Sequence, residues 1–206
     1  MPWGKIITFW SFRKELKIVL MAFLVVLLLP VVAVIILTQT GINIVSDKLV
    51  SLDSSTNTVE IHDPVSGEVI TTINSLMVWP VKGVITLEFA KSDLPYQLFH
   101  TGIDIANPFG KIGDDITPFM DGTVIYAGQT AIGFGKHIII DHGNKVTSLY
   151  GHLDKVLVYK GQKVKIGDVI GKEGSTGWST GPHLHFQIDV FGIPVNPRTF
   201  LGQVEF

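Results

Sequence analysis

The hydrophobic positions of this 206-residue chain follow two different patterns. Ile18 to Leu37 is a continuous apolar run that contains Pro30. A helix that crosses the hydrocarbon core of a bilayer needs about 20 apolar residues, and proline is commoner in such helices than in soluble ones. Beyond Trp79 the apolar residues occur in short runs rich in Val, Ile and Tyr, bounded by Gly, Pro, Asn and Asp. These patterns predict one transmembrane helix followed by an all-β domain.

The short apolar runs place the expected strands at residues 84–89, 122–127, 136–141, 145–152, 155–158 and 184–190. Asp141-His-Gly-Asn144 predicts a hairpin turn, because Gly and Asn accept a positive φ. Residues 38–76 are polar and turn-prone, and they predict a stalk that is either a small hairpin around Asp63–Gly67 or a flexible segment. The expected organisation is a cytoplasmic segment (1–17), a transmembrane anchor (18–37), an extracytoplasmic stalk (38–76) and the main domain (77–206).

Basic residues predict the orientation of the anchor. Lys5, Arg13, Lys14 and Lys17 precede the apolar run, and the first basic residue after it is Lys48. The positive-inside rule then places the N-terminus in the cytoplasm and the main domain outside. A cleaved signal peptide is the alternative, but its apolar region usually has about 7–15 residues and ends in a site of Ala-x-Ala type. The longer run without such a site favours an uncleaved anchor.

Charge and cysteine content narrow the function classes. Beyond residue 38 the chain has 12 basic and 17 acidic residues, a formal charge of −5. No basic patch stands out, which argues against nucleic acid as a partner. The chain has no cysteine, so neither a thiolate metal site nor a disulfide is available. An extracytoplasmic domain of this length must be stabilised by its own core.

Five residues between positions 100 and 185 carry the candidate chemistry. They lie in three short strings, His100-Thr-Gly-Ile-Asp104, Tyr150-Gly-His152 and His183-Leu-His185. Imidazole nitrogen and carboxylate oxygen are zinc ligands, and a catalytic zinc keeps three protein ligands and one open position. Five such groups suffice for a metal site with two residues left for acid–base chemistry, which points to metal-assisted hydrolysis.

Spacing alone leaves the roles within these strings open. On a strand, His183 and His185 face the same side about 6.6 Å apart, so both could bind one metal, or one could address the attacking water. His100 and Asp104 would lie about 13 Å apart on a straight strand, too far to share a zinc ion. The chain must therefore bend between them, and Gly102 tolerates the backbone angles of a bend.

His152 ends an expected strand, on which it shares a face with Val146, Ser148 and Tyr150. A polar face carrying Tyr and His within an apolar domain suggests a cleft, and a solvated sheet face is the alternative. The remaining histidines have no motif around them and are interpreted as surface or structural residues: His62, His137 and His142.

Taken together, the strings resemble a known family. The stretch 79–201 is similar to the lysostaphin-type zinc metallopeptidases, which cut peptide cross-links in peptidoglycan. The segments that carry this resemblance, in order, are His100-Thr-Gly-Ile-Asp104, Tyr150-Gly-His152-Leu, the hairpin-like Gly161–Gly171, the signature Gly174–Phe186 with its Pro-His-Leu-His, and Asn196-Pro197. The segment 107–118 departs from the pattern, because it is longer than the compact loop expected after the aspartate.

The resemblance implies specific roles and a fold. His100, Asp104 and His185 would bind Zn²⁺, His183 would act as the general base on the attacking water, and His152 would help to stabilise the oxyanion. The implied fold class is all-β, a compact barrel-sandwich hybrid with the site in a groove on its sheet. The implied substrate is the peptide part of peptidoglycan.

Two other function classes compete with an active endopeptidase. Some members of the family have lost zinc ligands and instead bind cell wall or activate another wall hydrolase, but all five residues are present here. Biotinyl and lipoyl carrier domains share Gly-rich hairpins, but a carrier would not explain five placed metal-type residues. The sequence therefore favours a membrane-anchored zinc metalloendopeptidase, with its protein partners unknown.

Overall fold

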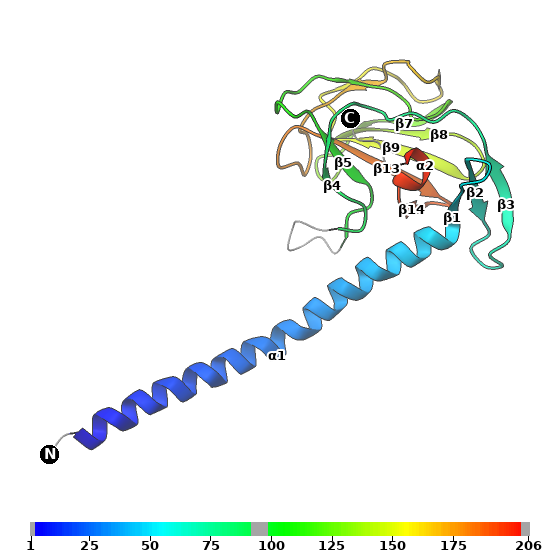
Figure 1. The fold of residues 1–206 in the computed structure, drawn as a ribbon. Helices are drawn as coiled ribbons and strands as arrows, with labels where there is room; N and C mark the ends of the chain where they lie inside the picture. Colours follow the sequence, from blue (N-terminus) through cyan, green and yellow to red (C-terminus); the bar gives the residue numbers. More distant parts are fainter. Residues whose placement is uncertain (1–2, 92–98, 203–206) are drawn as a thin grey trace. The chain divides into compact units, whose positions relative to one another are not determined.

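The computed structural model describes residues 3–91 and 99–202 (Figure 1). Residues 1–2 of the expected cytoplasmic segment, and residues 92–98 and 203–206 of the expected main domain, lie outside the described residues. The chain divides into two compact units, residues 1–38 and 39–206.

Helix α1 runs from Trp3 to Leu49 and contains the whole expected anchor. Within the anchor, apolar side chains such as Leu20, Val26 and Leu37 are exposed all around the helix. A helix that is apolar on every side is typical of a membrane span. In the part of the chain that the structure describes, it is the one helix long and apolar enough to cross a membrane, and it lies near the N-terminus, where signal sequences also occur.

The segment expected as a stalk is largely ordered secondary structure. After α1, a three-stranded antiparallel sheet is formed by β1 (Val50–Asp53), β2 (Thr58–His62) and β3 (Val69–Ile73). The β2–β3 turn contains the expected Asp63–Gly67. Inward-facing side chains of this sheet, including Val59 and Ile61, belong to the same apolar cluster as the main sheet. A freely flexible segment is therefore not what the structure has, although the domain boundaries themselves stay a prediction.

The main sheet of the described residues has eight strands, all paired antiparallel, in the order β11-β7-β8-β9-β13-β5-β4, with β14 also pairing with β13 (Figure 1). The strands are β4 (Val84–Leu87), β5 (Ile103–Ala106), β7 (Gly122–Gln129), β8 (Lys136–Asp141), β9 (Val146–Gly151), β11 (Lys163–Val164), β13 (Leu184–Val190) and β14 (Ile193–Val195). A third, small sheet joins β10 (Lys155–Val156), β12 (Gly171–Lys172) and β6 (Asp115–Ile116). The short helix α2 (Arg198–Leu201) follows.

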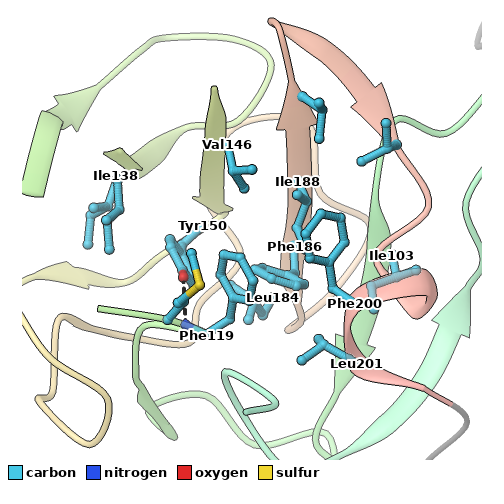
Figure 2. Packing of buried hydrophobic residues seen from close by; sticks show 14 of the residues in the cluster. Ile103, Phe119, Ile138, Val146, Tyr150, Leu184, Phe186, Ile188, Phe200 and Leu201 are labelled. Carbon is cyan, nitrogen blue, oxygen red and sulfur yellow. Dashed lines mark hydrogen bonds between the residues drawn. The ribbon is translucent and has the colours of Figure 1, made fainter. Parts of the chain in front are cut away.

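One face of the main sheet builds the apolar core (Figure 2). Leu184, Phe186 and Ile188 alternate along β13 and are completely buried. The ring of Phe119 packs edge-on against Phe186 and Phe200, with ring centroids 5.7 and 6.0 Å apart. Because alternate residues of a strand face opposite sides, the residues between these core positions are free to face the site.

The expected all-β class is confirmed, and so are the six expected strands, two of them with the same end residues and the others within two residues at their ends. The β8–β9 hairpin also forms, with Gly143 and Asn144 at positive φ. The sequence missed several short strands, β5 and β14 among them. The segment Gly161–Gly171 is not a hairpin, because β11 pairs with β7 while β12 pairs with β6 and β10.

Candidate metal centre

Three neighbouring strands bring the five candidate residues together. His185 lies on β13, directly opposite Asp104 on β5 and Gly151 on β9. His152 follows the end of β9, and His183 precedes β13, where it forms a bridge with Gly174. The pairing of β5, β13 and β9 therefore gathers residues that are up to 85 positions apart in the sequence.

His100, Asp104 and His185 form one group of donor atoms. The His100 Nε2 and His185 Nδ1 atoms are 2.9 Å apart, and each lies 3.1 Å from Asp104 Oδ1. In the described part of the chain, this is the group of three or more His, Asp or Glu residues whose ligand atoms lie within 4.8 Å of one another. Both histidines are buried and Asp104 is half-buried.

The outer nitrogen of each histidine is held by another group. His100 Nδ1 donates to the carbonyl oxygen of Glu88, 3.3 Å away, and His185 Nε2 donates to Gln187 Oε1 at 3.5 Å. The amide of Gln187 in turn donates to Asp189 Oδ1 at 2.7 Å. These contacts fix the protons on the outer nitrogens, so the inner nitrogens present bare lone pairs.

This donor set fits a zinc ion. Two nitrogen lone pairs and a carboxylate oxygen directed at one point repel one another unless a cation lies between them. Zinc bonds of about 2.0–2.2 Å in a tetrahedron separate neighbouring donors by about 3.4 Å. The observed separations of 2.9 and 3.1 Å are close to that value. Two imidazoles and one carboxylate also leave a fourth coordination position.

Two further contacts hold the loop that carries His100. The backbone N–H of Ala90 donates to the His100 carbonyl, and the His100 N–H donates to the Lys91 carbonyl. The side chain of Glu88 forms a bidentate ion pair with Arg198 at 2.6 and 3.0 Å. Hydrogen bonds from Arg198 keep the pKa of Glu88 below its usual value although burial opposes this. The C-terminal helix thereby fixes the strand end that orients His100.

The carboxyl group of Asp104 is ionised. Burial by itself would raise its pKa, but the interactions with the His100 and His185 rings outweigh burial and hold the pKa well below its usual range. Burial lowers the pKa of His185, which favours the neutral imidazole that can act as a metal ligand. The electrostatics therefore favour an anionic oxygen and a neutral imidazole at the centre.

His152 and His183 lie beside this group, and each has one ring nitrogen that is held by a backbone carbonyl and one that is not. Their ring centroids are 4.8 Å apart. His152 Nδ1 donates to the Thr176 carbonyl at 2.7 Å, and His183 Nδ1 donates to the Gly181 carbonyl at 2.9 Å. The Nε2 atom of each ring is therefore the proton acceptor in the neutral form, and that of His183 lies 3.5 Å from Asp104 Oδ2. Burial lowers the pKa of His152 to about 4.

The expectation that Ser148 and Tyr150 share the face of His152 is wrong. Both side chains are buried in the core, where Ser148 lies between Tyr150 and His142. His152 escapes from that face because its φ of 60° breaks the alternation of β9. The suggested cleft with a lining of Tyr and Ser is therefore replaced by a core network beneath the sheet.

The bend between His100 and Asp104 is present at residues 101–102, but the reason for its glycine differs from the expected one. Gly102 does not have a positive φ. A Cβ atom at this position would lie 2.3 Å from the carbonyl oxygen of Phe186 on β13. Glycine therefore permits the close approach of two backbones rather than an unusual backbone angle.

The other histidines lie outside the centre, as expected. His62 contacts Ser51 in the first sheet, His137 stacks on Tyr126, and His142 bonds to Ser148. Sequence reasoning missed the supporting residues. Gln187 and Asp189 follow His185 at the i+2 and i+4 positions of one strand face, so strand alternation could have identified them.

The all-β domain carries two histidines and an aspartate at one point, a group that could hold a metal ion, with two more histidines beside it. The sequence profile of peptidase family M23 matches residues 98–197. The chain belongs to peptidase family M23. Its lysostaphin-like, mostly β fold, expected from the resemblance, is confirmed by this match and by the solved structures.

Among solved structures, the catalytic domain of the M23 protein EnpA from Enterococcus faecalis is 37% identical with a TM-score of 0.51, and the alignment covers 58% of this chain and 92% of that one. The peptidoglycan DD-endopeptidase ShyA of Vibrio cholerae is 44% identical over 97 residues, 47% of this chain and 22% of that protein. The murein hydrolase activator NlpD of Escherichia coli is 41% identical over 125 residues, 61% of this chain and 31% of that protein. The chain thus spans less than a third of either curated relative.

Proposed function

We propose that the chain is a membrane-anchored zinc metalloendopeptidase that hydrolyses peptide cross-links of peptidoglycan. The observation that carries this proposal is the convergence of His100 Nε2, His185 Nδ1 and Asp104 Oδ1 on one point, with two proton-accepting imidazoles beside it. A chain that had kept the fold only for binding would not need this complete set.

His100, Asp104 and His185 are the proposed zinc ligands. A bound zinc lowers the pKa of a coordinated water to about 7 and polarises the scissile carbonyl. Glu88 and Gln187 hold the outer nitrogens of the two histidines, and such supporting contacts typically contribute 10–100-fold to metal affinity.

His183 is the proposed general base. Its Nδ1 proton is engaged by the Gly181 carbonyl, so Nε2 is free to accept the proton of the attacking water. Its Nε2 also faces Asp104 Oδ2 at 3.5 Å, which stabilises the imidazolium that forms. A positioned base of this kind contributes roughly 10²–10⁴-fold to the rate.

His152 is the proposed stabiliser of the oxyanion. In the neutral form its Nδ1 proton points at Thr176, so Nε2 has no proton to donate. Because burial lowers the pKa of His152 to about 4, it must take up a proton during turnover before it can donate to the oxyanion. This role therefore requires a proton that reaches His152 from the reaction itself or from solvent.

The proposed location is the cytoplasmic membrane, with a single span, the N-terminus inside and the peptidase domain outside. The anchor 18–37 within helix α1 is long enough to span a bilayer and apolar on every side, and basic residues precede it in the sequence. Peptidoglycan lies outside that membrane, so this orientation places the domain beside its substrate. Protease added to wall-stripped cells should remove the domain and leave a membrane-bound N-terminal fragment; release of a soluble form lacking residues 1–38 would contradict the anchor.

The experiment that tests the chemistry uses the full chain purified in detergent. Zinc content is measured by atomic absorption, and purified cell wall is digested and analysed for newly freed amino groups and released muropeptides. The wild type should hold one zinc per chain and release cross-linked peptides. His185→Ala should lose zinc and activity, whereas His183→Ala should keep zinc and lose roughly 10²–10⁴-fold in rate. His62→Ala, outside the centre, is the matched control and should keep both.

Activation of another wall hydrolase is the second candidate function, favoured by the similarity to the Escherichia coli activator. A second wall hydrolase added to the same digestion assay separates the two functions. A wild type that releases nothing alone but stimulates the added hydrolase, with His183→Ala equally effective, supports the activator and contradicts the endopeptidase. If His183→Ala loses zinc and His185→Ala retains it, then the roles of zinc ligand and general base that are assigned to these two histidines are reversed.

A further inference from the structure

Glu173 is a buried carboxylate for which the proposed chemistry has no use. It follows β12 directly and its side chain is 0% exposed. Neither carboxylate oxygen has a hydrogen-bond partner among the described residues. Buried charges are normally paired, hydrogen-bonded or bound to a metal ion, so an unpartnered carboxylate indicates a missing ligand.

A second carboxylate lies across the ladder from Glu173. Strand β12 pairs with β6 through Lys172 and Asp115, which form an ion pair. The ladder continues one step further, because the Glu173 N–H donates to the Asp114 carbonyl at 2.9 Å and the Gly113 N–H donates to the Glu173 carbonyl at 3.0 Å. Glu173 and Asp114 therefore face one another on the side opposite to that ion pair.

No basic side chain forms an ion pair with either carboxylate within the ranges 14–91 and 99–202. Asp114 is half-buried and accepts one hydrogen bond of 2.6 Å, from the amide of Asn107. Like charges placed directly opposite on neighbouring strands destabilise a sheet. The pair is therefore under repulsion that neither the ladder nor Asn107 relieves.

The surroundings of Glu173 also show the direction of its carboxylate. Burial and, to a smaller extent, the charge of Asp114 raise its pKa to about 7, and the backbone N–H of Asn107 opposes them without reaching hydrogen-bond geometry. The groups that act on Glu173 are thus Asp114 and the start of the 107–114 loop. Its carboxylate points toward that loop, into the space that it shares with Asp114.

We propose that Asp114 and Glu173 form a binding site for a hard divalent cation of the calcium class, separate from the His100, Asp104 and His185 centre. Calcium takes carboxylate and carbonyl oxygens as ligands, and both acidic side chains offer such oxygens. Neither carboxylate contacts a histidine in the described structure. Zinc favours nitrogen ligands, and only the other centre offers them.

A cation at this site would fasten the 107–114 loop to β12. The loop begins three residues after Asp104, and Gly174, which follows Glu173, forms the bridge to His183. Calcium would therefore hold together two segments that lead directly into the proposed active site. The loop is part of the segment 107–118, which is longer than the compact loop that the family resemblance implies after the aspartate.

The test measures calcium binding by the full chain in detergent. Calcium is removed on a chelating resin, and one equivalent of zinc is then restored because the resin also removes zinc. Soluble chelators are avoided, since they would remove zinc during the measurement. Thermal unfolding and isothermal titration are then followed with calcium chloride from about 0.1 to 10 mM, the range in which weak extracellular calcium sites are filled. The wild type should bind one calcium and its Tm should rise by about 3–10 °C.

Glu173→Gln should abolish calcium binding and the Tm rise, and Asp114→Asn should weaken binding at least tenfold. Asp115→Asn, next in the chain but facing the other side, is the matched control and should respond like the wild type. If Glu173→Gln fails to fold, Asp114→Asn decides. A wild type that binds no calcium up to 10 mM overturns the proposal, and so does binding that is unchanged in both variants. A Glu173→Gln protein more stable than a calcium-insensitive wild type would show that Glu173 holds a proton instead.

Discussion

The phenol group of Tyr150 offers the sharpest test of how the core supports the site. Its Oη accepts a hydrogen bond from the Phe119 N–H at 2.9 Å and lies 3.0 Å from Ser148 Oγ (Figure 2). Ser148 is in turn 2.7 Å from His142 Nε2. Tyr150 is completely buried, and burial raises its pKa, so the phenol stays neutral. Tyr150→Phe removes one oxygen atom and keeps the ring that packs on Phe186.

The expected loss follows from the groups left behind. Phe119 is completely buried, so its N–H loses its hydrogen-bond partner without access to water, which costs about 1–3 kcal/mol. Ser148 keeps its contact with His142, so its loss is smaller. We expect Tyr150→Phe to be about 2–3 kcal/mol less stable. For a domain of this size, that change lowers Tm by about 5–10 °C.

The assay is urea and thermal unfolding of the zinc-free chain, followed by circular dichroism, with Tyr159→Phe as the control. Tyr159 is 70% exposed, and its substitution should change stability by less than about 0.5 kcal/mol. Zinc content should be unchanged in both variants, because neither phenol contacts the metal centre. A Tyr150→Phe protein as stable as the control would refute the assignment of its oxygen as the partner of Phe119, and loss of zinc would show that Tyr150 belongs to the site after all.

Two further predictions concern the backbone and pH. Gly102→Ala should destabilise the fold by about 1–3 kcal/mol and lower zinc affinity at least tenfold, because the new Cβ would lie 2.3 Å from the Phe186 carbonyl oxygen. Gly181→Ala is the control, since no atom lies within 4 Å of its Cβ position, and it should change neither stability nor zinc affinity. Equal zinc affinities of the two variants in a zinc titration would contradict this prediction. Burial lowers the pKa of folded His142 to about 4, below the usual 6.5, so the stability it contributes is complete above about pH 6.5 and is lost as pH falls toward 4. His142→Gln should therefore reduce the pH dependence of the unfolding free energy of the zinc-free chain, measured by urea unfolding between about pH 4 and 7. The reduction corresponds to at most one bound proton, which is about 1.4 kcal/mol per pH unit.

Much of the fold could be predicted because its signals are local. Alternation and turn residues placed six strands, and the hairpin of β8 and β9 followed from Gly143 and Asn144. Strands of two to four residues, such as β6 and β14, are too short to show alternation, and they form because a neighbouring strand supplies the partner. For residues 50–73 the sequence left a small hairpin and a flexible segment open, because the choice depends on the burial of Val59 and Ile61 against a core distant in the sequence.

For the candidate site, the sequence by itself determined the chemistry available: which side chains could hold a metal, and which pair would share a strand face. Only the tertiary structure decided how they meet. The pairing of β5, β13 and β9 brings Asp104 opposite His185, and a φ of 60° turns His152 away from the face of Tyr150. Residue type and local spacing are properties of short segments, whereas strand order and close backbone approach depend on contacts between segments about 80 residues apart. For the same reason, the burial of Glu173 opposite Asp114 could not be predicted from the local sequence.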